Sequence, residues 1–120
     1  MDDKKRKRLV ANEIKRLTDI FKEVDSKKQR TVKGLVEESA FMKATLAELK
    51  EIIQSEGVVN EMEQGSYSII REHPALKSYN TTIQRYTTVT EKLLGLLPKD
   101  APKQDDDLSE FNAFLNERAD

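Results

Sequence analysis

The sequence contains no cysteine, no tryptophan and only one histidine. Without cysteine the chain can form neither disulfide bonds nor thiolate metal sites, so a reducing compartment is permitted. No stretch approaches the roughly 20 apolar residues of a membrane-spanning helix, and the N-terminus lacks the apolar segment of a signal peptide. We therefore expect a soluble cytoplasmic protein with no membrane partner.

Signatures of catalysis are equally scarce. The sequence shows no phosphate-binding loop, no nucleophile paired with a base, and no residues with metal-ligand spacing. Only carboxylates remain as metal ligands, and the acidic run Asp105–Asp107 lies in a segment that we expect to be too flexible to preorganise a site. The sequence therefore predicts a protein that is not an enzyme and that has no metal or cofactor.

The small net charge of −1 hides an uneven distribution. Residues 1–34 hold twelve Lys/Arg and six Asp/Glu, whereas residues 98–120 hold three Lys/Arg and seven Asp/Glu. A basic N-terminal third attracts polyanions, and an acidic C-terminal segment favours a different partner. The charge pattern thus indicates two separate interaction regions.

Two long amphipathic helices are predicted in the first half of the chain. Apolar residues recur every three or four positions, first over about residues 5–25 and then over about residues 27–56. A turn is expected at Asp25 and Ser26, because Ser26 and Gln29 have the spacing of a capping box. Gly57 is the expected end of the second helix.

A short β-hairpin is predicted over about residues 58–72, because β-branched and aromatic residues flank a turn signal at Gln64–Gly65. An isolated hairpin is marginal in water, so it should pack on the helices or on another subunit. A third helix is predicted over about residues 74–97. Pro74 suits its first position, and His73 is interpreted as the cap rather than as a pH switch or a base.

The third helix carries a narrow apolar stripe that we interpret as a core or subunit interface; base stacking by its two tyrosines is the weaker alternative. Because all three predicted stripes are narrow, we expect a mainly α, oligomeric protein. Residues 1–97 are expected to form one helical domain for oligomerisation and, on the basis of the basic residues described below, for DNA binding. The predicted oligomerisation residues are Leu76, Tyr79, Ile83, Tyr86, Leu93 and Leu97.

Residues 98–120 are expected to form a disordered, acidic arm. Its four apolar residues could line one face of a short helix, which is marginal alone but suited to docking on a partner. The predicted docking residues are Leu108, Phe111, Phe114 and Leu115.

The basic residues of the first helix are predicted to hold phosphate groups without reading base sequence. Arg8, Lys15 and Lys22 are spaced by seven and lie away from the apolar stripe, and Lys27, Lys28, Arg30 and Lys33 continue the positive charge past the turn. A solvated, fraying basic terminus is the alternative. The predicted DNA-binding residues are Lys4, Lys5, Arg6, Lys7, Arg8, Lys15, Arg16 and Lys22.

Three segments, "RLTDIFKEVD", "LVEESAFMKATLAELKEII" and "EQGSYSIIREHPALKSYNTTIQRYTTVTEKLLGLLPK", resemble in order and spacing the small terminase subunits of tailed phages and prophages of Gram-positive bacteria. The resemblance covers about residues 9–99. It implies a ring-like homo-oligomer in the cytoplasm of the bacterial host. Such a ring binds double-stranded viral DNA at the packaging start and recruits and regulates the large ATPase–nuclease subunit.

Two other functions are compatible with the same residues. One is a helical, oligomeric interaction module that does not bind nucleic acid, and the other is a coiled-coil scaffold or chaperone of another phage component. Many small terminases have an N-terminal helix-turn-helix, whereas the two helices predicted here are long and hairpin-like. The resemblance therefore predicts DNA binding but not how the DNA is contacted.

Overall fold

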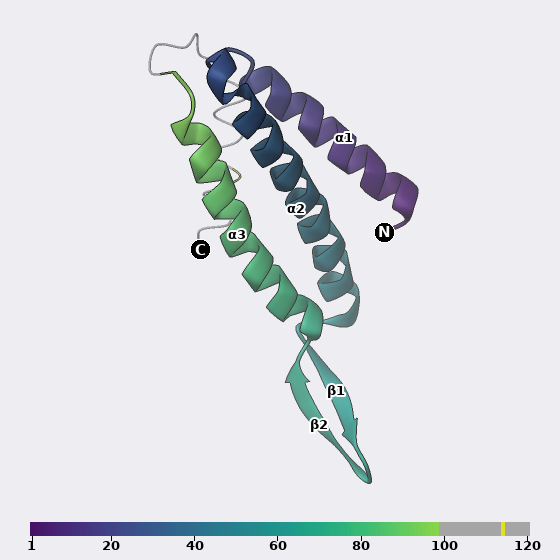
Figure 1. The fold of residues 1–120 in the computed structure, drawn as a ribbon. Helices are drawn as coiled ribbons and strands as arrows, with labels where there is room; N and C mark the ends of the chain where they lie inside the picture. The colour runs from purple at the N-terminus through teal and green to yellow at the C-terminus, as the bar shows by residue number, and fades with distance from the viewer. Residues whose placement is uncertain (99–113, 115–120) are drawn as a thin grey trace.

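The computed structural model describes residues 1–98 and Phe114. Three helices, α1 (Asp3–Ile20), α2 (Gln29–Glu56) and α3 (Pro74–Gly95), run alternately up and down, and α2 packs against both of the others (Figure 1). A two-stranded antiparallel hairpin extends from the end where α2 and α3 meet. The elongated molecule measures 63 × 31 × 24 Å, and the mainly helical fold with a hairpin before the third helix is confirmed.

Helix α1 begins two residues earlier than predicted and ends five residues earlier. It begins at Asp3 because the Asp2 carboxylate accepts a hydrogen bond from the Lys5 backbone N–H at 2.7 Å. It ends at Ile20, although the apolar spacing continues to Val24. Phe21 and Val24 are buried in the turn, which explains why apolar spacing alone overestimates the length of the helix.

The turn between α1 and α2 does not contain the predicted capping box. The Gln29 side chain points backwards, where its Nε2 donates to the backbone carbonyls of Phe21 at 3.1 Å and Val24 at 2.7 Å. A short 3₁₀ turn, η1 (Ser26–Lys28), precedes α2, and the Asp25 carboxylate caps it by accepting from the Lys27 N–H at 3.1 Å. Gln29 therefore satisfies carbonyls at the end of α1, and α2 begins two residues later than predicted.

The hairpin consists of β1 (Val59–Gln64) and β2 (Tyr67–Glu72). Gly57 ends α2 with a φ of +88°, as expected of a C-terminal glycine. The two-residue turn is Gly65–Ser66, one residue later than predicted, with Gln64 paired to Tyr67. Gly65 has a φ of +65° and Ser66 does not have a positive φ, which is the pattern of a type II′ turn.

His73 joins the hairpin to α3 and caps that helix, as predicted from the sequence. Its ring Nδ1 accepts from the Ala75 N–H at 3.0 Å, and its Nε2 lies 3.0 Å from Glu56 Oε1 at the end of α2. Its backbone N–H donates to the Val58 carbonyl at 2.9 Å. One residue thus fixes the junction of three elements. Helix α3 ends at Gly95, two residues before the predicted end.

The hydrophobic core lies at the end of the molecule that contains the α1–α2 turn. It combines the C-terminal part of α1, the first turns of α2 and the last turns of α3. Apolar burial there is the main force that holds the three helices together. The buried members are Leu17, Ile20, Phe21, Val24, Val32, Val36 and Leu93.

Candidate nucleic-acid and partner-binding surfaces

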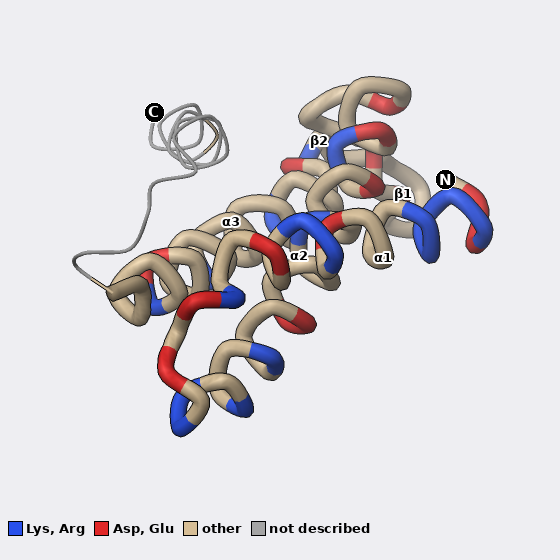
Figure 2. Tube along the Cα trace, turned by 90° about the horizontal axis from the view of Figure 1, so that it is seen from above, with Lys and Arg blue, Asp and Glu red and all other residues tan. Residues whose placement is uncertain are grey.

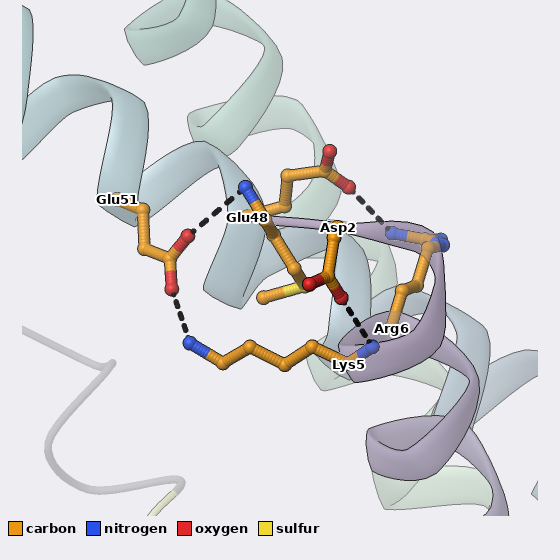
Figure 3. A network of polar contacts seen from close by, with 6 residues as sticks. Asp2, Lys5, Arg6, Glu48 and Glu51 are labelled. Carbon is orange, nitrogen blue, oxygen red and sulfur yellow. Dashed lines mark hydrogen bonds and ion pairs between the residues drawn. The ribbon is translucent and has the colours of Figure 1, made fainter.

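Arg6, one of the predicted DNA-binding residues, is held by α2. Its guanidinium donates to Glu48 Oε2 at 3.0 Å (Figure 3). It also donates to Thr45 Oγ1 at 2.7 Å. The same group lies 4.8 Å from the centre of the Phe41 ring, within the range of a cation–π contact. A phosphate would have to replace these contacts in order to bind Arg6. In the structure, Arg6 links α1 to α2.

Glu51 of α2 adds to this link between α1 and α2 by pairing with two positive groups. Its carboxylate accepts from Lys5 Nζ at 2.8 Å and lies 3.4 Å from the N-terminal amine (Figure 3). The hydrogen bond from Lys5, supported by the charges of both cations, lowers the pKa of Glu51. Two of the five residues of the basic run at positions 4–8 therefore fasten the start of α1 to α2.

Arg16 takes part in a buried ionic cluster. Glu13 is only 4% exposed, and its carboxylate accepts from Arg16 Nε at 2.6 Å and lies 2.9 Å from Lys43 Nζ. Burial raises the pKa of Glu13, but the hydrogen bonds and charges of Arg16 and Lys43 outweigh it and hold this pKa below the ordinary value. Nothing in the sequence indicates this cluster beyond a Glu and an Arg three residues apart.

The other predicted DNA-binding residues lie on exposed surface. Lys7 pairs with Asp3 at 3.1 Å and Lys22 pairs with Asp19 at 3.4 Å, but exposed pairs of this kind are weak. Three predicted DNA-binding residues form no ion pair with any residue that the structure describes: Lys4, Arg8 and Lys15.

A second group of cations lies at the α1–α2 turn. We call it the turn cations: Lys27, Lys28, Arg30 and Lys33. All four are exposed, and none makes an ion pair with a residue that the structure describes. Arg30 and Lys33 also line a groove of about 510 Å³ between α1 and α2. Figure 2 shows that basic and acidic segments are interspersed along the tube. The end with the α1–α2 turn is therefore distinguished from the rest of the molecule by its unpaired cations and not by its net charge.

The residues predicted to form the subunit interface have two different environments. Tyr86 and Leu93 are fully buried within the single chain, whereas Leu76, Tyr79, Ile83 and Leu97 are half-buried. Burial, assisted by the negative charge of Glu13, raises the pKa of Tyr86. Tyr86 is therefore a core residue in this conformation, where it can neither stack on a base nor reach a second copy.

Large exposed apolar side chains occur instead on the hairpin. Ile70 is 74% exposed and Tyr67 is 63% exposed, and they lie on opposite faces of the two strands. Val58 and Val59, at the base of the hairpin, are about half exposed. Exposed apolar residues along a projecting hairpin are typical of a contact surface. The sequence indicated that the hairpin needs a partner but could not show that the helices leave it bare.

Of the predicted docking residues, Phe114 is the one that the structure describes. Its ring lies edge-to-face on Tyr86, with centroids 5.4 Å apart and planes at 81°. Lys43 Nζ lies 5.3 Å from the centre of the same ring. Leu108, Phe111 and Leu115 lie outside the described residues.

Among residues 1–98 and Phe114, no three His, Cys, Asp or Glu side chains are grouped closely enough to hold a metal ion. No helix in this part of the chain is both long and apolar enough to cross a membrane. The chain matches no protein-family model, no curated protein and no solved structure. Its function must therefore be inferred from its own residues and their arrangement.

Proposed function

We propose that this chain is a DNA-packaging adaptor of the small terminase type. It would bind double-stranded viral DNA as a ring-like homo-oligomer and would recruit and regulate the large ATPase–nuclease subunit in the bacterial cytoplasm. The resemblance over about residues 9–99 supports this proposal, as does the presence of exposed cations at one end of the molecule and exposed apolar residues at the other.

The turn cations are the observation that carries the DNA-binding part of the proposal. A Lys or Arg without a carboxylate partner can bind a phosphate without first breaking an ion pair, and the release of counterions then favours binding. Lys27 and Lys28 lie in a short helical turn, and Arg30 and Lys33 lie in the first turns of α2, so the cations are fixed relative to one another. Arg8 and Lys15 extend the exposed charge along α1.

The hairpin supports the oligomeric part of the proposal. A two-stranded sheet with Ile70 and Tyr67 exposed on opposite faces is marginal in water, because little of its apolar surface is buried. Association of several hairpins would bury these side chains and pair the free strand edges. The hairpin lies at the opposite end from the turn cations, so both surfaces can be occupied together (Figure 1).

Duplex binding as a function of salt tests the proposal. Replacing the four turn cations by alanine should weaken binding. It should also reduce the slope of the logarithm of the binding constant against that of the salt concentration, by about 0.9 for each phosphate that is no longer neutralised. Fluorescence anisotropy of a labelled duplex measures both quantities. A matched control is Lys50, Lys77, Arg85 and Lys92 to alanine, which removes the same charge from exposed positions on α2 and α3.

The control should keep most of the wild-type slope. Equal reductions in the two variants would mean that only the total charge matters, and the proposed surface would be wrong. A wild-type chain that does not bind duplex DNA at low salt would overturn the DNA-binding role altogether.

The alternative function is a helical, oligomeric interaction or scaffold protein that does not bind nucleic acid. It is favoured by one observation: Lys5, Arg6 and Arg16 are used in ion pairs within the chain. Light scattering separates this alternative from the first proposal when it is combined with the duplex assay. A scaffold would assemble but would not bind DNA, whereas a packaging adaptor would do both.

A further inference from the structure

A groove of about 350 Å³ lies beside the helical core, between α1 and α2, and Phe114 forms one of its walls. The α2 side of the groove presents Ala44 and Ala47, whose small side chains leave room for a ring. The α1 side presents Leu9 and the buried carboxylate of Glu13. The groove therefore combines apolar side chains with charged groups from both helices, Glu13 and Arg16 from α1 and Lys43 from α2.

Two contacts hold the Phe114 ring. One is the edge-to-face contact with Tyr86 of α3, a preferred geometry for aromatic pairs. The other is the contact with the Lys43 ammonium at 5.3 Å, which favours the ring because the face of an aromatic ring is negative. Phe114 thus touches groups from α2 and α3 that lie far from it in sequence.

Lys43 is prepared for this contact by Glu13. The Glu13 carboxylate holds Lys43 Nζ at 2.9 Å and is itself held by Arg16 at 2.6 Å. A flexible lysine fixed in this way loses less freedom when the ring binds. Phe114 therefore contacts two side chains that are already held in place within the chain, Lys43 by its ion pair and Tyr86 by its burial.

The ring at the edge of the groove belongs to the same chain. Residues 99–113 separate Pro98 from Phe114, and 15 residues can span up to about 50 Å. Helix α3, with 22 residues, is about 33 Å long, so the connection can return along its whole length. The negative charge of residues 98–120 also complements Arg16 and Lys43 at the groove.

We propose that the edge of this groove, together with Tyr86 of α3, is a docking site for Phe114 of the chain's own C-terminal arm, and that docking withholds Phe114 from other proteins. The first part is independent of the packaging role. The second part rests on the proposed function, in which the arm engages the large subunit. A large subunit would then have to draw Phe114 out of the groove, so that recruitment and undocking of the arm are one event.

Nuclear magnetic resonance on the full chain tests the docking. A nuclear Overhauser contact between the Tyr86 and Phe114 rings is expected, and Phe114→Ala should shift the Tyr86 ring signals and increase amide exchange around Glu13 and Lys43 by roughly threefold to tenfold. Phe111→Ala is the matched control, because it removes the same ring from the same arm. It should shift the Tyr86 signals less than Phe114→Ala does.

Absence of the ring contact in the wild-type chain, or equal effects of the two phenylalanine variants, would overturn the proposal.

A mixture of isotope-labelled and unlabelled chains checks the origin of Phe114. A ring contact that appears only between labelled and unlabelled molecules would assign the groove to a second copy and overturn docking within one chain. None of these measurements involves DNA or a large subunit, so their outcome is independent of the packaging proposal. Failure of duplex binding would leave the docking result intact.

Discussion

Apolar side chains are buried at one end of the molecule and exposed at the other. At the α1–α2 turn, Leu17, Phe21 and Leu93 are almost completely buried because three helices converge on them. At the other end Ile70, an equally apolar residue, is 74% exposed because the two strands have no helix or third strand against them in the part of the chain that the structure describes. The chain thus has one region whose apolar side chains are buried within a single copy and one region whose apolar side chains are exposed.

This difference indicates where a partner can add the most stability. Burial of apolar surface contributes roughly 25 cal/mol per Å², so a hairpin with exposed Ile and Tyr residues gains from any surface that covers it. The helical end has already buried its apolar residues and offers charge instead. A partner that bound the helical end would therefore be selected by electrostatics, and a partner that bound the hairpin would be selected by apolar contact.

The largest expected effect is in the helical core. Leu93→Ala should reduce the free energy of unfolding by about 2–5 kcal/mol, because it leaves a cavity among residues of three helices. Ile70→Ala is the control on the hairpin, and it should change this free energy by no more than about 0.5 kcal/mol. Urea unfolding followed by circular dichroism measures both, at concentrations too low for light scattering to detect assembly.

Equal losses of unfolding free energy for the two substitutions at low protein concentration would contradict this comparison, since Ile70 would then be packed within the single chain. A loss for Ile70→Ala that grows with protein concentration would strengthen it. That result would place the hairpin at an interface between copies.

A smaller effect is expected at Glu13. Glu13→Gln should reduce the free energy of unfolding by about 2 kcal/mol at neutral pH, because it weakens two charge-assisted hydrogen bonds in a buried place. Glu51→Gln is the matched control: the pKa of Glu51 is also lowered, but its carboxylate lies at the surface. The control should have a much weaker effect because solvent screens exposed pairs.

The pH dependence of the same variants gives an independent check. The folded-state pKa of Glu13 lies below its ordinary value, so the stabilisation is complete above about pH 5 and is lost as the pH falls through the folded-state pKa. The wild-type chain should therefore lose more stability on acidification than the Glu13→Gln variant. Parallel pH profiles for the two proteins would contradict the ionic role of Glu13.

The smallest effect is expected at His73, at the junction of the two regions. His73→Ala should reduce stability by about 1 kcal/mol because it removes the cap of α3. His73→Asn should recover part of this loss, since an Asn oxygen can accept from the first N–H groups of a helix but cannot reach Glu56 in the same way. Thermal unfolding measures the difference, and equal melting temperatures for the two variants would argue against a capping role.

Much of the fold could be predicted because its signals are local. The spacing of apolar residues predicts three helices, Gly57 predicts an end of α2, and His73 followed by Pro74 predicts the start of α3. Each of these depends on backbone geometry within a few residues. The errors are also local: Gln29 has the spacing of a capping residue, but it bonds backwards to carbonyls in the turn.

The candidate sites were less predictable because they depend on contacts between distant residues. No spacing in the sequence indicates that Arg6 meets Glu48, that Glu13 meets Lys43, or that Phe114 reaches Tyr86. The basic run at positions 4–8 was therefore predicted to bind DNA as a unit, whereas Lys5 and Arg6 are tied to α2. The turn cations were recognised as positive but could not be recognised as unpaired.

By itself the sequence determined the helices, the hairpin and the separation of basic and acidic segments, because hydrophobic periodicity and charge act over neighbouring residues. Only the tertiary structure decided which cations remain unpaired, which apolar residues stay exposed and where Phe114 lies. These depend on how three helices meet, and the packing of side chains from distant segments sets that arrangement.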